Sequence, residues 1–153
     1  MRFVLQRVSR GAVVIDGGET RSIGPGLVVL AGVCAGDDER VCAFMADKLA
    51  CLRIFGDQDG NLNRSLLDVG GECLLISNFT LYASCKKGRR PSFIDAAPPA
   101  LARQIYNQLT QAVSDAVAGR LQTGEFGAHM DIDMLCDGPV TILLDSAELM
   151  KNK

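Results

Sequence analysis

Two short runs of the sequence combine hydroxyl, amide and turn-forming residues at which chemistry could take place. Residues 77–82 have the sequence SNFTLY, which predicts an apolar strand ending in a cluster of small hydroxyl side chains. Residues 136–141 have the sequence CDGPVT, in which a Gly-Pro turn opens another predicted strand. Neither run supplies a paired acid and base. Taken alone, the second run indicates only a turn, because a cis X-Pro bond is uncommon in folded proteins.

Conventional catalytic side chains are few elsewhere in the chain. His129 is the only histidine, which excludes a zinc site built on several histidines and leaves a Ser-His-Asp triad no other base. A lone histidine in a strand-like segment is more often structural than catalytic. Residues 57–61 (DQDGN) resemble part of a calcium loop but lack its full spacing, so we expect a solvated turn. The sequence therefore predicts neither a metal ion nor a cofactor.

The cysteines form no recognisable metal-binding or disulfide pattern. They are Cys34, Cys42, Cys51, Cys73, Cys85 and Cys136. None belongs to a C-x-x-C motif, and Cys42 and Cys51 fall on opposite faces of one predicted helix. We expect the cysteines to be reduced and mostly buried, and to pack as small apolar side chains.

A compact basic segment follows the first run. Its charges are Lys86, Lys87, Arg89 and Arg90, on either side of Gly88. Such a segment is either a solvated loop or a patch that contacts the phosphates of an RNA backbone. Its position beside residues 77–82 favours the second interpretation. The net charge of −2, by contrast, disfavours a long duplex-binding surface.

The hydrophobic pattern predicts one α/β domain spanning residues 1–153, with strands that dominate and two amphipathic helices that cover them. Strands are predicted at residues 2–9, 11–16, 27–31, 72–78 (continuing toward 82), 121–126, 129–135 and 140–145. Helices are predicted at residues 39–53, capped by Asp37 or Asp38, and at residues 99–118, started by Pro98 and Pro99. We expect layered, mixed or mostly antiparallel sheets.

The sequence shows no sign of membrane targeting. No apolar run approaches the roughly 20 residues that span a bilayer. The first ten residues (MRFVLQRVSR) lack the apolar region and the cleavage site of a secretory signal. We expect a cytoplasmic protein that does not bind membranes.

Along essentially its whole length, the chain resembles the D-aminoacyl-tRNA deacylases (D-tyrosyl-tRNA deacylases). The resemblance is carried by a collinear series of segments at residues 1–9, 23–27, 52–55, 65–71, 77–82, 88–93, 96–99, 124–128 and 136–141. Two positions depart from the family pattern. Asn78 stands where the family usually has Gln, and Cys136 stands where the second motif usually begins with Asn.

The resemblance implies a hydrolase that removes D-amino acids from tRNA and spares L-aminoacyl-tRNA. An aminoacyl ester with a neighbouring ribose hydroxyl is already reactive, so a rigid site needs only to orient the ester and a water and to stabilise the oxyanion. Main-chain groups suffice for this. A wall of main-chain carbonyls near the α-carbon would exclude an L side chain but admit many D side chains and glycine.

The resemblance also implies a homodimer and assigns roles to particular residues. A cis Gly138-Pro139 dipeptide would enter the partner's site, and Arg7 would steady it. Phe79 and Thr80 would line the site largely through main-chain groups. The remaining predicted substrate contacts are Ser77, Asn78, Phe126 and Met130, the last two forming the pocket for the terminal adenosine of tRNA.

Three alternatives remain open at the level of sequence. Thr80 could be a covalent nucleophile, although no nearby base is evident. Cys85 or Cys136 could pair with His129 in a cysteine hydrolase, although no spacing supports the pairing. The chain could also be a non-catalytic module that binds the 3′ end of tRNA, which the basic segment would suit equally well.

Overall fold

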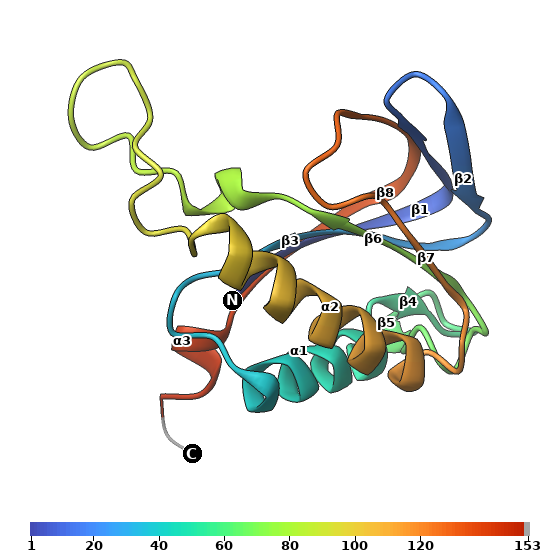
Figure 1. Cartoon of the computed structure of the whole chain (residues 1–153). Coiled ribbons are helices and arrows are strands. Elements are labelled where there is room, and N and C mark those ends of the chain that lie inside the picture. The colour runs from blue at the N-terminus through green and yellow to red at the C-terminus, as the bar shows by residue number, and fades with distance from the viewer. Residues whose placement is uncertain (152–153) are drawn as a thin grey trace.

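A computed structural model describes residues 1–151 (Figure 1). Six strands in this part of the chain form one mixed sheet: β1 (Arg2–Ile15), β2 (Glu19–Ile23), β3 (Gly26–Gly32), β6 (Glu72–Ser77), β7 (Leu121–Thr123) and β8 (Met130–Asp145). Two further strands, β4 (Phe55–Gly56) and β5 (Leu62–Arg64), form a separate hairpin. The helices are α1 (Glu39–Cys51), α2 (Pro99–Ala116), the short α3 (Ser146–Leu149) and the 3₁₀ helix η1 (Phe79–Tyr82).

The sheet is organised around β1. The first half of β1 pairs with β3, its second half pairs with β2, and β8 runs along its other edge, all antiparallel. On the far side of β3, the strands β6 and β7 are parallel to it and to each other. The predicted α/β class with a mixed sheet is therefore confirmed.

The two predicted long helices are present and lie together across one face of the sheet (Figure 1). Asp38 caps α1, since its Oδ1 accepts a hydrogen bond of 2.9 Å from the main-chain N–H of Val41. Pro99 occupies the first turn of α2, and Gly119 follows the helix at a φ of +76°. Both helices end slightly earlier than the sequence predicted.

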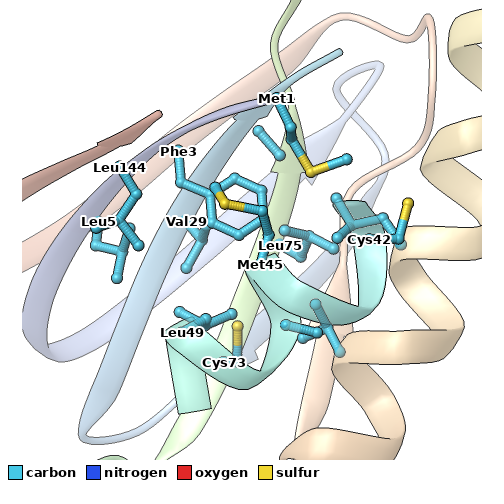
Figure 2. Close-up of a cluster of buried hydrophobic side chains, with 14 of the residues drawn as sticks. Met1, Phe3, Leu5, Val29, Cys42, Met45, Leu49, Cys73, Leu75 and Leu144 are labelled. Atoms are coloured by element: carbon cyan, nitrogen blue, oxygen red, sulfur yellow. The ribbon is translucent and has the colours of Figure 1, made fainter. Parts of the chain in front are cut away.

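Apolar side chains pack on both faces of the sheet. On the helical face, Phe3, Leu5, Val29 and Leu75 pack against α1 and α2, and Figure 2 shows them around Met45. Because side chains alternate along a strand, the neighbouring positions point to the opposite face. There a smaller cluster joins β1, β2, β3, β6 and the first half of β8; its buried members are Val8, Val13, Ile15, Ile23, Val28, Leu74 and Ile76.

The predicted break between strands 2–9 and 11–16 is wrong, because both belong to β1. Gly11 allows the strand to continue past β3: a Cβ atom there would lie 2.7 Å from Cγ2 of Val28. The register of β1 against β8 shifts on either side of Val8 instead. After β1, a turn with Asp16 and Gly17 at positive φ leads into β2, a strand that the sequence prediction missed.

The predicted continuation of a strand from residue 78 toward Tyr82 is also wrong. The side chain of Asn78 caps η1 by accepting a hydrogen bond from the main-chain N–H of Thr80, so the chain turns immediately after β6.

Near the C-terminus, the two strands predicted at 129–135 and 140–145 are one strand, β8, with an irregularity at residues 137–140. β7 is shorter than the predicted strand 121–126, and β4, β5 and α3 were not predicted. No helix within residues 1–151 is long and apolar enough to cross a membrane.

Candidate active site

A pocket of about 420 Å³ opens at the carboxyl ends of the parallel strands β3 and β6, the edge at which α/β sheets commonly bind ligands. Its walls come from these strand ends, η1, the start of α2 and the segment that leads into β8. The lining residues are Ala31, Val33, Ser77, Asn78, Phe79, Ala97, Pro99, Ala102, Phe126, Gly127, Ala128 and Met130. The lining is predominantly apolar, and none of these described residues carries a charge.

The structure gathers five of the predicted site residues around this one pocket. Ser77, Asn78, Phe79, Phe126 and Met130 come from two segments that are about 50 residues apart in the sequence. They meet because β6 and the segment after β7 end at the same edge of the sheet. Their contacts with a substrate stay predictions.

Asn78 organises the turn that carries Phe79 and Thr80. Its side-chain oxygen accepts a hydrogen bond of 3.2 Å from the main-chain N–H of Thr80 and a second, short one from the Thr80 hydroxyl. The hydroxyl proton is thus directed at an amide oxygen, which is not a base. This arrangement gives Thr80 none of the activation that a nucleophile needs.

Phe79 lies at the mouth of the pocket with 58% of its surface exposed. Its ring meets Phe93 edge to face, with 5.0 Å between the ring centroids. An exposed aromatic pair beside an apolar pocket is a surface suited to stacking against a planar ligand.

Phe126 and Met130 are fixed by small neighbours and by α2. Phe126 packs against Tyr106, with 5.8 Å between the ring centroids. The hydroxyl of Tyr106 donates a 3.0 Å hydrogen bond to the carbonyl of Leu75, and burial raises its pKa, which keeps it protonated. A Cβ atom at Gly124 would lie only 2.4 Å from Sδ of Met130, so this glycine makes room for the methionine.

The Gly138–Pro139 peptide bond is cis, as the resemblance implies, and it lies in a bulge of β8. Residues 137–140 fall between the paired positions Thr141 and Cys136, opposite Arg7. Gly138 has a φ of +129°, in a region that L side chains rarely adopt.

Arg7 contacts this bulge through its guanidinium. Its guanidinium donates hydrogen bonds to the carbonyls of Asp137 (3.2 Å) and Ile54 (2.8 Å) and lies 3.1 Å from the Asp137 carboxylate. On the other side, the Gln6 side chain donates to the carbonyl of Val140. Gly138 and Pro139 are exposed, and neither they nor Thr80 and Arg7 are among the described residues that line the pocket of their own chain.

The conventional catalysts do not assemble within the described part of the chain. His129 is largely exposed, and its Nε2 lies 3.3 Å from Oδ1 of Asp131. Within residues 1–151 it makes no hydrogen bond or ion pair with Cys85 or Cys136. No group of three metal-binding side chains occurs in the same residues.

The expectation of mostly buried cysteines is wrong, since only Cys42 and Cys73 are buried. All six are free, but Cys51, Cys85 and Cys136 are exposed, because they lie at a helix end, in a loop and on the open side of β8. Burial raises the pKa of the Cys42 thiol to about 11 and that of Cys73 to about 12, so both pack as neutral side chains.

The basic segment stands away from the body of the protein. It lies in the long loop after η1, which extends outward in Figure 1. Ser84 and Ser92 close the base of this loop with two main-chain hydrogen bonds, of 2.7 and 2.9 Å. Lys86, Lys87, Arg89 and Arg90 are all exposed beyond this closure.

Sequence reasoning missed the small residues of the pocket wall. They are Ala31, Val33, Ala97, Pro99, Ala102, Gly127 and Ala128. An alanine carries no chemical signature, and its place in a wall follows only from the tertiary fold. Phe126 could be found because it lies in one of the segments on which the resemblance depends.

The fold and the pocket define an α/β domain with a mixed sheet whose uncharged, predominantly apolar pocket opens at the carboxyl ends of the parallel strands β3 and β6. The family model described as D-Tyr-tRNA(Tyr) deacylase matches residues 4–145. The chain therefore belongs to the D-Tyr-tRNA(Tyr) deacylase family.

Individual relatives agree with this membership. A D-aminoacyl-tRNA deacylase from Thermomicrobium roseum is 54% identical, over 97% of this chain and 96% of the relative. One from Solidesulfovibrio magneticus is 51% identical, over 97% of this chain and 98% of the relative.

Among solved structures, a c-Myc DNA unwinding element binding protein superposes with a TM-score of 0.89 at 36% identity, covering 95% of this chain and 98% of that one. A probable eukaryotic D-amino acid tRNA deacylase has the same fold, with a TM-score of 0.86 at 16% identity over 94% and 97% of the two chains.

Proposed function

We propose that this protein hydrolyses the ester bond of D-aminoacyl-tRNA in the cytoplasm, releasing the D-amino acid and the tRNA and sparing L-aminoacyl-tRNA. The observation that carries the proposal is the family match across residues 4–145. The pocket supports it, because residues 77–79 of the first run lie together with Phe126 and Met130 around a space of about 420 Å³. That space suits the terminal adenosine, with Phe126 and Met130 against the base.

The reaction does not need an ionisable catalyst from the protein. The neighbouring hydroxyl of the terminal ribose assists the attack of water on the ester carbonyl. The N–H of Phe79 is the first of η1 and has no acceptor within that helix, so it is available to the developing oxyanion. The Thr80 N–H, in contrast, is already bonded to Asn78. This chain therefore orients the ester and water, and the substrate supplies the hydroxyl.

Selection by chirality would come from a second copy of the chain. In a homodimer, the exposed Gly138-Pro139 bulge enters the partner's pocket and places main-chain carbonyls against the α-carbon of the substrate. The bulge suits this role because Arg7 and Gln6 bond it on either side and because its residues are not among those that line the pocket of about 420 Å³ in their own chain. An L side chain would collide with this wall. A D side chain would point outward, and glycine, having no side chain, would also be hydrolysed.

The basic loop would contribute affinity for tRNA rather than chemistry. Lys86, Lys87, Arg89 and Arg90 are exposed on a loop whose base adjoins Phe93, the ring partner of Phe79. A loop of four cations that begins at the mouth of the pocket is placed to contact phosphates beyond the terminal nucleotides.

The deciding experiment compares matched substrates that differ only in chirality. Purified protein is mixed with D-tyrosyl-tRNA, L-tyrosyl-tRNA or glycyl-tRNA, and the remaining ester is measured over time. We expect rapid loss of the D-tyrosyl and glycyl esters and background loss of the L-tyrosyl ester. Equal rates for the D and L esters would refute the proposal. Protection of the D ester against spontaneous hydrolysis would instead identify a non-catalytic module that binds tRNA 3′ ends.

A further inference from the structure

Arg103 is a charged residue beside the pocket to which the reaction above gives no role. It follows Ala102, a lining residue, in α2. The carbon at the centre of its guanidinium lies 4.8 Å from the ring centroid of Phe126, over the face of that ring. A Cβ atom at Gly127 would lie 3.8 Å from Nη2 of Arg103. Because Phe126 and Gly127 both line the pocket, the guanidinium stands at its rim.

Most N–H groups of the Arg103 guanidinium make no hydrogen bond to the described residues 1–151. It makes one long hydrogen bond, of 3.5 Å, from Nη2 to the carbonyl of Phe126. Within residues 1–151 no ion pair joins Arg103 to a carboxylate. The acidic residue next to Phe126 in the sequence, Glu125, approaches Arg21 instead, at 3.9 Å. Arg103 is therefore an exposed cation whose charge no acidic side chain of this region neutralises.

A cation held in this way fits the anionic part of the substrate. The pocket itself is uncharged, so it can take the base and the ribose but offers nothing to a phosphate. Contact with the Phe126 ring and the hydrogen bond to its carbonyl restrain the Arg103 guanidinium, and a guanidinium can pair with two oxygens of a phosphate.

We propose that Arg103 binds the phosphodiester group that joins the terminal adenosine to the rest of the tRNA. The inference rests on the proposed function, because it takes the pocket to hold that adenosine. The phosphate contact fixes the position of the terminal nucleotide along the pocket and so brings the ester next to Phe79. Arg103 is a substrate-binding residue in this scheme and takes no part in the bond cleavage.

The test uses two stable analogues of the substrate terminus. In both, 3′-amino-3′-deoxyadenosine carries D-tyrosine through an amide, which replaces the ester; one has a free 5′-hydroxyl and the other a 5′-methylphosphate, which bears the single charge of a phosphodiester. The dissociation constants are measured by isothermal titration calorimetry. We expect the wild-type protein to bind the phosphorylated analogue about tenfold more tightly, the effect of one charge-assisted contact. In Arg103→Met the ratio should fall to about one.

Two further variants make the result specific. Arg103→Lys keeps the charge and should retain part of the preference. Arg40→Met removes an exposed arginine of α1 that does not line the pocket, and it should keep the full tenfold ratio.

Two outcomes overturn the inference. One is an unchanged ratio in Arg103→Met, including the case in which both analogues bind more weakly by the same factor, since Arg103 would then act only by holding Phe126. The other is equal binding of the two analogues by the wild-type protein. Because the amides are not hydrolysed, the ratio is independent of turnover. A protein that shows the tenfold ratio and fails to hydrolyse D-tyrosyl-tRNA would support the phosphate contact and refute the proposed reaction.

Discussion

At the scale of single residues, the structure shows what Asn78 does at the position where the family usually has Gln. Its amide is one methylene shorter than that of glutamine, and its side chain folds back to bond both the N–H and the hydroxyl of Thr80. The sequence identified this position as unusual. The sequence could not predict the direction of the Asn78 side chain, because an asparagine before a turn is equally able to point into the pocket.

The same geometry leads to a prediction about Thr80. Thr80→Ala should lower the single-turnover rate of D-tyrosyl-tRNA deacylation by less than about tenfold, because its hydroxyl faces an amide and not a base. Removing the 2′-hydroxyl of the terminal ribose should cost about 100-fold, the usual scale of lost proton-transfer assistance. Circular dichroism of the variant serves as the control for folding. An inactive but folded Thr80→Ala, together with a deoxy substrate that reacts normally, would identify Thr80 as the nucleophile.

Residues differed in how much the sequence revealed about them. Phe79, Phe126 and Arg7 were identified through resemblance, and the structure places each in a defined contact. Arg103 was overlooked, because an arginine on the polar side of an amphipathic helix has the same appearance as any solvated charge. Only its stacking on Phe126 distinguishes it.

At the scale of elements, helices were predicted better than strands. The caps and apolar spacing of α1 and α2 are local signals, and both helices begin where Asp38 and Pro99 indicated. Strand ends depend on partners that are distant in the sequence. The length of β1 is an example, since it continues through Gly11 only because β2 and β8 pair with its second half.

The junction of β8 and α3 carries a pH-dependent contribution to stability. Asp145 accepts hydrogen bonds from Arg2 (2.8 Å) and from the main-chain N–H of Ala147 (2.9 Å). Burial alone would raise the pKa of this carboxyl, but these bonds and the charge of Arg2 outweigh it and lower the pKa. A lowered pKa stabilises the fold above the unfolded-chain value of about 3.9, and this contribution is lost as the pH falls through the folded-state pKa.

The variant Asp145→Asn therefore provides a test with a defined pH window. At pH 7 its urea midpoint should be lower than that of the wild-type protein, because the ion pair with Arg2 is gone. As the pH falls below the lowered folded-state pKa of Asp145, the wild-type carboxyl is protonated too, and the two midpoints should converge. Asp133→Asn, which alters a more exposed pair with Arg10, is the matched control and should change little at either pH. A constant difference across the range would show that Asp145 acts through its shape alone.

At the scale of the whole molecule, the pocket and the Gly138-Pro139 bulge are separate features of one chain. This separation is what a composite site in a symmetric dimer requires, since each pocket would be completed by the bulge of the other subunit. A Cβ atom at Gly138 would lie 2.8 Å from the main-chain nitrogen of Val140, so Gly138→Ala should displace the bulge and abolish activity.

Mixed dimers provide the corresponding experiment. Gly138→Ala is combined by co-expression with Phe126→Ala, which damages the pocket, and each variant alone should be nearly inactive. In a mixed dimer one site carries both lesions and the other carries neither, so a random mixture should recover about a quarter of the wild-type activity. Failure to recover any activity, with mixed dimers demonstrated by differential tags, would mean that each chain builds its own site. An active monomer in size-exclusion chromatography would have the same meaning.

The loop that carries the basic segment has a consequence for how this protein can evolve. Its two ends are joined by the hydrogen bonds between Ser84 and Ser92, so the residues between them are removed from the packing of the domain. Insertions, deletions and charge changes there should be accepted at little cost to stability. If the loop binds tRNA as proposed, changes within it would alter the preference for particular tRNAs and would leave the packing around the pocket as it is. The two properties would then be able to change independently during evolution.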